Sequence, residues 1–398
     1  MSNKPNYTRR DFLSIGTVGS ALLLVAPRLK SQTIPWQKEM RFYVGTYTAN
    51  TGSEGIYLCK LEIETGKLSL LSKGKGVDDP SFITIDRKGK YLYSVNELIE
   101  YEGKASGSVS SFAIDPKSGS LKFVNKQPSM GGAPCHISIT EDGRYILVAN
   151  YLGGNVSVFP LGSDGTIGPS TDLVQHAGSG PNKDRQLSAH AHSITLDEKG
   201  RFAVAADLGI DRVMIYELDR AQGKLKPNAA QLFFQAKPGA GPRHFAFHPK
   251  GKLAFVINEL DSSVTSLSYD GKGGTLKEIQ TLSTLPPGFS DPNTCADLHV
   301  SPDGKFLYGS NRGSDSIVAF SVDGDSGKLT YIENTPTGGK KPRNFAIDPT
   351  GNFLLAANQD TGNIVVFRVD KRSGKLQNTG HRIEIPAPVC LKFVTGTN

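Results

Sequence analysis

A turn-and-strand unit is repeated along almost the whole chain. GKLAFVIN has relatives in GKYLYSVN, GRYILVAN, GRFAVAAD, GKFLYGSN and GNFLLAAN, and RFYVGT near the start fits without its turn. The seven copies follow one another at intervals of 47 to 57 residues and end at Thr46, Asn96, Asn150, Asp207, Asn258, Asn311 and Asn358. A sustained period near 50 residues indicates one supersecondary unit that is used many times.

Each copy is followed by a second run in which apolar and polar residues alternate, such as GNVSVFPLG or GNIVVFRVD. A turn of the GKL type comes next, and a weaker fourth run leads to the following copy. Period-two alternation between Gly, Asp and Asn turns is typical of β-strands, and the 44 glycines fit a chain with many turns. Four strands in about 50 residues form one blade of a β-propeller. We therefore predict an all-β, seven-bladed β-propeller with four antiparallel strands per blade.

The two ends of the chain are expected to meet in one blade. The chain enters the repeat at a second strand, RFYVGT, whereas PVCLKFV near the C-terminus matches a first strand. The C-terminal strand should therefore complete the N-terminal blade and close the ring, which leaves only short edges exposed. One propeller domain would span residues 40–398. Its longest irregular stretch, 175–191, is polar and Gly-rich, and we expect a loop on one face.

Residues 1–30 differ from everything that follows. Arg9 and Arg10 precede Phe12 and Leu13, and a short apolar run comes next. The run is too short and too rich in Gly for a comfortable membrane span, and the T-R-R-x-F-L pattern resembles a twin-arginine export signal. We therefore expect the Tat export machinery as a partner and a periplasmic location. No A-x-A-like cleavage site is clear, so an uncleaved leader would anchor the protein in the membrane. A frayed cytosolic N-terminus is the alternative.

The basic charge of the chain belongs mostly to this leader. Of the formal net charge of +7, the first 30 residues hold +4. No basic run with interleaved aromatic residues occurs later, so we expect no nucleic-acid partner. The four cysteines show no CxxC spacing and are predicted to be buried or free thiols. No cluster has the spacing of a calcium or zinc site, so we predict no metal and no other cofactor.

Two positions in each repeat should line one mouth of the central channel, because the start of a first strand and the end of the second lie at the same edge. The position just before each first strand holds Ser81, Cys135, His192, Arg243, Ala296, Arg343 and Val389. The position just after each second strand holds Tyr47, Glu97, Tyr151, Leu208, Glu259, Arg312 and Gln359.

Charged side chains gather in four successive repeats, which contribute His192, Arg243, Glu259, Arg312 and Arg343. Arginine binds phosphate and carboxylate bidentately, so this mouth should attract a small anion. Among these cations Glu259 should stay ionised, and it could orient or activate a water. His190, two residues before His192, is an equal candidate for acid–base work. Ordinary salt bridges at the channel mouth are the alternative interpretation.

Other polar residues near the mouth have structural interpretations. His136, His244 and His299 fall in or beside predicted strands, where we favour hydrogen-bonded structural roles. The Asn or Asp that ends most second strands is expected to bond backbone groups between blades or in the following turn.

The runs GPRHFAFHP, VINEL, HVSPDGKFLYGSNRGSDSI and SAHAHSI resemble the seven-bladed-propeller lactonase family. That family includes the bacterial 6-phosphogluconolactonases of the cycloisomerase-2 type and the fungal 3-carboxy-cis,cis-muconate lactonizing enzymes. The resemblance covers nearly everything after the leader, and it is much more specific for the family than for the substrate.

The resemblance implies a metal-independent site with one His, two Arg and one Glu. The Arg of GPRH falls on Arg243, the Glu of the N-E-L run on Glu259, and the Arg of S-N-R-G on Arg312; the His falls on His192 or His190. The implied reaction is hydrolysis of a sugar δ-lactone, such as 6-phosphogluconolactone, to the acid. Glu259 or His192 would activate water, and the two arginines would hold the anionic tail and the developing oxyanion. We assign substrate binding to His190, Arg343 and Glu97.

Two other functions stay open. A muconate-type lactonizing cycloisomerase would use the same residues, and a non-catalytic periplasmic binding propeller would need none of them to converge. 6-Phosphogluconolactone is a cytoplasmic intermediate of the pentose phosphate pathway, whereas this chain looks exported, so a different periplasmic lactone is also considered. We expect a monomer that takes a small anionic lactone.

Overall fold

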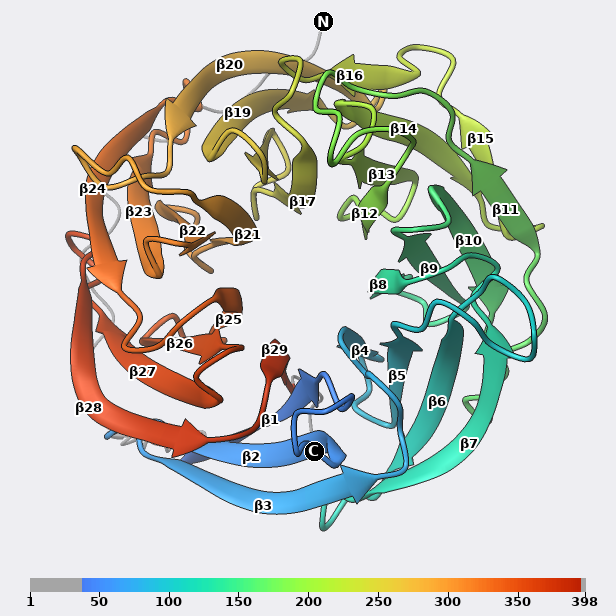
Figure 1. Cartoon of the computed structure of the whole chain (residues 1–398), viewed down its shortest axis with the longest axis horizontal. Helices are drawn as coiled ribbons and strands as arrows, with labels where there is room; N and C mark the ends of the chain where they lie inside the picture. The colour runs from blue at the N-terminus through green and yellow to red at the C-terminus, as the bar shows by residue number, and fades with distance from the viewer. Residues whose placement is uncertain (1–37, 395–398) are drawn as a thin grey trace, which may run out of the picture. The chain divides into compact units, whose positions relative to one another are not determined.

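Every regular element of the computed structural model, which describes residues 38–394, is a β-strand. The strands form seven antiparallel sheets, and Figure 1 shows these sheets as blades around a common axis. Within the described residues, no helix is long and apolar enough to cross a membrane. The prediction of a seven-bladed, all-β propeller is confirmed, while the predicted export leader, residues 1–30, lies outside the described residues.

Each blade runs from an inner strand near the axis to an outer strand at the rim. The inner strands, in ring order, are β29 (Pro388–Phe393), β4 (Ile83–Ile85), β8 (Pro134–Ile139), β12 (Ala191–Leu196), β17 (Pro242–Phe247), β21 (Thr294–Val300) and β25 (Pro342–Ile347). The second strands are β1 (Glu39–Thr46), β5 (Tyr91–Asn96), β9 (Tyr145–Asn150), β13 (Phe202–Asp207), β18 (Leu253–Asn258), β22 (Phe306–Arg312) and β26 (Phe353–Asn358).

The two remaining layers complete the blades. The third strands are β2 (Gly55–Glu62), β6 (Ser108–Ile114), β10 (Asn155–Pro160), β14 (Arg212–Asp219), β19 (Ser263–Asp270), β23 (Ser316–Val322) and β27 (Asn363–Val369). The outer strands are β3 (Leu68–Lys75), β7 (Leu121–Pro128), β11 (Asp172–Gln175), β15 (Lys224–Pro227), β20 (Thr275–Ser283), β24 (Leu329–Pro336) and β28 (Leu376–Glu384).

The ring closes within the first blade, as the sequence predicts. β29 pairs antiparallel with β1, so that Leu391 lies opposite Val44 and Phe393 opposite Phe42. Figure 1 shows the two strands, drawn in red and blue, side by side. Because the sheet joins residues from both ends of the described chain, the blade cannot be completed without β29.

One blade departs from the four-strand pattern. In the fourth blade the outer strand is split, because β15 pairs with one end of β14 and β16 (Phe233–Gln235) pairs with the other. The side-chain amide of Asn228, which lies between the two pieces, donates to the carbonyl oxygens of Gly273 and Gly274 in the next blade. The break in the outer strand therefore accompanies a contact between blades, and this sheet has five strands.

The GKL-type turns are packing sites as well as turns. Gly374 has a φ of +74°, which favours glycine, and a Cβ placed on it would lie 2.4 Å from Cδ1 of Phe306, the first residue of a second strand in the preceding blade. Gly165 meets Tyr91 in the same way, at 2.2 Å. The repeated glycine lets the turn of one blade pack directly against an aromatic side chain of the neighbouring blade. Any larger residue at this position would push the two blades apart.

Candidate active site

Six of the inner strands contain a β-bulge at their mouth end. The register shifts leave out Cys135, His192, Arg243, Arg343 and Val389, and in β21 the shift spans Ala296 and Asp297. A bulge re-aims the side chain that it leaves unpaired. The sequence placed these residues just before the strands, but they lie inside them, because each strand continues past its bulge by one or more residues. Ser81, which precedes β4, is the exception.

Glu259 follows β18 and lies at the centre of an arginine cluster. Its Oε2 is 2.8 Å from Nε of Arg243 and 2.9 Å from Nη2 of Arg312, and its Oε1 is 2.7 Å from Nη2 of Arg185. Only 4% of the Glu259 side chain is exposed. Three arginines from three different parts of the chain therefore share one carboxylate, and we call these four residues the Glu259 cluster.

The charges of the cluster decide how Glu259 ionises. Burial alone would raise the pKa of this carboxyl, but the positive charges of Arg312, Arg243 and Arg185 outweigh burial and lower the pKa to about 2. Glu259 is therefore ionised at neutral pH, as the sequence predicts. Both of its oxygens already accept from arginines, which makes it a weak proton acceptor in this arrangement.

Arg243 is buried to 1% exposure even though it carries a charge. Its Nη1 donates to the carbonyl oxygen of Ala296 and lies 3.2 Å from Nε2 of His244, while Nε is held by Glu259. Burial, together with the charge of Arg312, lowers the pKa of Arg243 to about 10, so the guanidinium stays charged at neutral pH. In the described part of the chain no protein acceptor holds its Nη2, which is free to meet a ligand.

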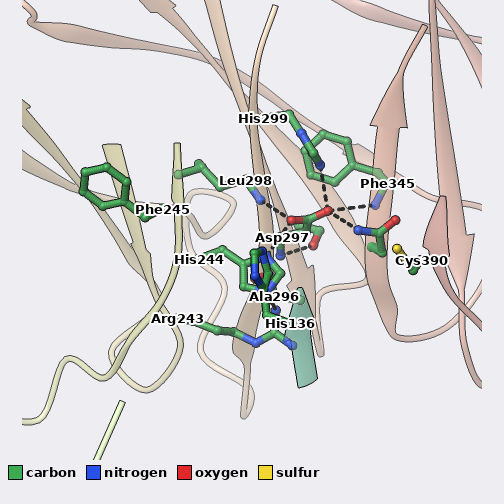
Figure 2. A network of polar contacts seen from close by, with 12 residues as sticks. His136, Arg243, His244, Phe245, Ala296, Asp297, Leu298, His299, Phe345 and Cys390 are labelled. Carbon is green, nitrogen blue, oxygen red and sulfur yellow. Dashed lines mark hydrogen bonds and ion pairs between the residues drawn. The ribbon is translucent and has the colours of Figure 1, made fainter. Parts of the chain in front are cut away.

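Behind Arg243 lies a network around the buried carboxylate of Asp297 (Figure 2). Asp297 accepts from Nδ1 of His244 at 2.7 Å and Nε2 of His299 at 2.9 Å, and also from the side-chain amide of Asn344. Burial and the charge of Arg243 lower the pKa of His244 to about 4, so its ring is neutral. A proton on Nδ1 then leaves Nε2 as the acceptor for Arg243. His244 and His299 are hydrogen-bonded as predicted, and His244 also helps to orient Arg243.

His192 and His190 have different surroundings. His192 is 4% exposed, its Nδ1 lies 3.7 Å from Sγ of Cys135, and no protein atom in the described residues hydrogen-bonds its Nε2. Burial and the charge of Arg243 hold the pKa of His192 well below its usual range, so the ring is neutral. His190 instead stacks on the ring of Tyr151 with centroids 4.5 Å apart, and its Nδ1 lies 2.9 Å from the Tyr151 carbonyl oxygen. Nε2 of His190 likewise has no protein partner in the described residues, so each histidine has one available ring nitrogen, and His192 is the more deeply buried of the two.

A second and looser charge cluster faces the first. Glu97, which follows β5, accepts from the hydroxyl of Tyr47 at 2.9 Å and lies 3.8 Å from Nη2 of Arg343. The Arg343 guanidinium also lies over the Tyr47 ring, 5.4 Å from its centroid. We call these three residues the Glu97 cluster. The structure thus brings together two of the three residues that we expected to bind substrate, whereas His190 lies apart from them, against Tyr151.

A small cavity joins the two clusters. Its walls include Glu97, Arg243 and Arg343, together with Ser81, Phe82, Cys135, His244 and Val389. The hydroxyl of Ser81 is buried and has no hydrogen-bond partner in the described structure, which is unusual for a native polar group. Arg243 and Arg343 therefore border one space, and a polar atom there would meet at least one unused donor.

Arg185 is a site residue that the repeat comparison missed. It comes from the loop between β11 and β12, which the sequence predicted as an irregular stretch on one face. Arg243 and Arg312 each occupy a position that recurs in every repeat, but an inserted loop has no equivalent in the other blades. Its sequence signal is limited to an unusually long polar connection that contains the run NKDRQ.

Most residues with predicted structural roles behave as expected, but the Asn258 amide donates to the side-chain hydroxyls of Ser263 and Thr265 and not to backbone groups. The amides of Asn96, Asn150, Asn311 and Asn358 donate to backbone carbonyls of neighbouring turns. The four cysteines are free and buried. Across residues 38–394, no group of three or more His, Cys, Asp or Glu is arranged to hold a metal ion.

The chain matches known proteins over nearly the whole propeller. The family model described as "Lactonase, 7-bladed beta-propeller" matches residues 41–393. The chain belongs to this family.

The chain is similar in sequence to two named relatives and in structure to a solved protein. A Bacillus subtilis (strain 168) protein named 6-phosphogluconolactonase is 40% identical over 352 residues, which is 88% of this chain and 97% of the relative. A Formosa agariphila protein of the same name is 38% identical and covers 77% of this chain and 86% of its own. The structure of the Pseudomonas aeruginosa periplasmic gluconolactonase is 33% identical, with a TM-score of 0.83 over 90% of this chain and all of that one.

Proposed function

We propose that this lactonase-family chain hydrolyses a sugar δ-lactone to the corresponding acid, and that the substrate is 6-phosphogluconolactone or a related lactone. The observation that carries the proposal is the convergence of four arginines and two glutamates beside a neutral histidine with a free nitrogen. The arginines outnumber the glutamates by two, so the mouth favours an anionic ligand. The relatives named above support lactone hydrolysis and do not favour a lactonizing cycloisomerase or a binding propeller.

In this proposal, Arg243 and Arg312 bind the oxygen on which negative charge develops. Arg243 has its Nη2 unused, and Nε of Arg312 is buried without a protein partner. Because Glu259 and backbone carbonyls fix both guanidinium groups in advance, little reorganisation is needed when the carbonyl oxygen becomes an oxyanion. Glu259 thus acts by holding the arginines in place.

The sequence left Glu259 and His192 as alternative proton acceptors, and the geometry favours His192. The pKa of each group is lowered, but a neutral imidazole with a free Nε2 can take a proton, whereas the Glu259 carboxylate is bonded to Arg243 and Arg312 and its pKa is about 2. In the proposed step, water attacks the lactone carbonyl carbon and gives one proton to His192. The bond from that carbon to the ring oxygen then breaks, and the ring oxygen takes the proton as it leaves. The product is the open hydroxy acid.

The test is hydrolysis of 6-phosphoglucono-δ-lactone by the full chain and by the His192→Gln variant. We expect kcat to fall by roughly 100- to 10,000-fold in the variant, the usual range for losing a general base. A His190→Gln variant serves as the matched control and should lose much less. Equal losses of kcat in the two variants would contradict the assignment of His192 as the proton acceptor.

We further propose export by the Tat machinery to the periplasm, with the protein acting there as a monomer. The paired arginines Arg9 and Arg10 support export, and a similar Pseudomonas protein is named a periplasmic gluconolactonase. Replacing both arginines by lysine should keep the full chain in the cytoplasm, as cell fractionation would measure. The molecular mass of the exported chain shows whether the leader is still attached, which distinguishes a membrane-anchored form from a released one.

A further inference from the structure

Arg185 differs from the other arginines of the Glu259 cluster in where it comes from. Arg243 lies in an inner strand and Arg312 ends a second strand, and their side chains are 2% and 14% exposed. Arg185 reaches the same carboxylate from the loop between β11 and β12, and 37% of its side chain is exposed. It is therefore the member of the cluster that an incoming ligand meets from solvent.

The base of Arg185 is fixed although its side chain is exposed. Its neighbour Gln186 is fully buried and donates from Nε2 to the Leu208 carbonyl oxygen and to Oδ1 of Asp211, both at 2.8 Å. The Asn182 side chain caps the turn by accepting from the backbone of Arg185 at 3.2 Å. The side chain can therefore change its partner while the backbone that carries it stays in place.

The contacts of Arg185 use only one of its nitrogen atoms. Nη2 reaches Oε1 of Glu259 at 2.7 Å and the hydroxyl of Tyr151 at 3.1 Å. Within residues 38–394, no protein acceptor bonds its Nε or Nη1. Glu259 would keep Arg243 and Arg312 if Arg185 left, so the carboxylate would not become an unpaired buried charge. Moving Arg185 from Glu259 to another anion costs little free energy, because one charged contact replaces another.

We propose that Arg185 is a specificity-determining residue that leaves Oε1 of Glu259 to grip the phosphate group of a phosphorylated sugar lactone. This inference rests on the proposed lactone hydrolysis, and it adds that the enzyme recognises the phosphate group of its substrate. The fork of the guanidinium matches a phosphate bidentately. When a lactone without a phosphate binds, Arg185 stays bonded to Glu259. Only the phosphorylated lactone therefore gains a charged contact with Arg185.

The test compares two substrates, 6-phosphoglucono-δ-lactone and unphosphorylated glucono-δ-lactone, in the full chain. The measured quantity is the ratio of their kcat/KM values. In Arg185→Ala this ratio should fall about 10- to 100-fold, the usual worth of a hydrogen bond to a charged group. Arg185→Lys, which keeps a charge without the fork, should fall in between. Lys183→Ala removes a positive charge from the same loop and should leave the ratio unchanged.

Two results would overturn the inference. One is a ratio in Arg185→Ala within about threefold of the unaltered chain, because Arg185 would then only hold Glu259. The other is an equal fall in Lys183→Ala, because the effect would then come from the overall charge of the loop. If the unaltered chain hydrolyses neither lactone, lactone hydrolysis fails as the function. Calorimetric affinities for 6-phosphogluconate and gluconate then still decide the role of Arg185, and equal affinities in the unaltered chain reject it.

Discussion

The two glutamates of the channel mouth have the same place in the repeat but different surroundings. Glu97 and Glu259 each follow a second strand within the run N-E-L. Glu259 is 4% exposed and meets three arginines at 2.7 to 2.9 Å, whereas Glu97 is 16% exposed and meets one arginine at 3.8 Å and a tyrosine hydroxyl. Identical local sequence thus produces one rigid cluster and one loose one.

The difference comes from the strands and the loop around each glutamate and not from the glutamates themselves. The bulge of β17 supplies Arg243 beside Glu259, β22 ends in Arg312, and an inserted loop adds Arg185. Ser81 precedes the inner strand beside Glu97, and the next bulge carries Cys135, so neither position adds charge. A carboxylate bonded to three guanidinium groups fixes their positions. A carboxylate that lies farther from a single guanidinium group can be replaced by a ligand as the partner of that group. The following predictions test this contrast.

The largest effect is expected for Glu259→Gln. The amide would turn a donor toward arginines that need an acceptor, and the arrangement of all three would be lost. We expect kcat to fall by about 1,000-fold, comparable to losing a preorganised oxyanion site, with a smaller change in KM. Steady-state lactone hydrolysis measures both constants. Turnover close to that of the unaltered chain would show that the cluster is only structural.

A smaller but still large effect is expected for Arg243→Lys. Lysine keeps the charge but cannot contact Glu259, the Ala296 carbonyl and His244 at once, as the guanidinium does. We expect kcat/KM to fall about 100-fold, with the melting temperature recorded to confirm folding. The control is Arg201→Lys on the surface, where a salt bridge to Glu217 is exposed and the change should have no measurable effect.

Glu97→Gln should have a modest effect, which sharpens the contrast. Glutamine can still accept from Tyr47, and Arg343 keeps its place over the Tyr47 ring. We expect a change of about tenfold or less, mainly in KM, because an ion pair at 3.8 Å contributes little. A loss in kcat as large as that of Glu259→Gln would show that the two clusters are equivalent.

The smallest effect concerns acid stability. The pKa of Glu259 is lowered from 4.5 to about 2 in the folded chain, so ionised Glu259 stabilises the fold above pH 4.5. This contribution is lost progressively as the pH falls from about 4.5 to about 2. The melting temperature of Glu259→Gln should therefore depend less on pH in this window than that of the unaltered chain. Parallel melting curves over the same window would contradict the proposed ionisation.

Local sequence was sufficient to predict the blades. Period-two alternation and the GKL-type turns specify strands, and seven copies of the unit can bury their faces only against one another. The match of RFYVGT and PVCLKFV to different strands of one blade also predicted how the ring closes. The split outer strand of the fourth blade was not predicted, because the contact of Asn228 with Gly273 and Gly274 joins different blades.

By itself, the sequence determined the repeat, the ring, and which charged residues occupy its mouth positions, because these follow from strand period and turn chemistry. How those residues are paired follows from the folded arrangement of the blades and the loop. The bulges aim Arg243 and His192 into the mouth, the Asp297 network fixes the tautomer of His244, and the loop brings Arg185 onto Glu259. Most of these pairings join different blades or the inserted loop, and a pattern within one repeat contains no information about distances between them.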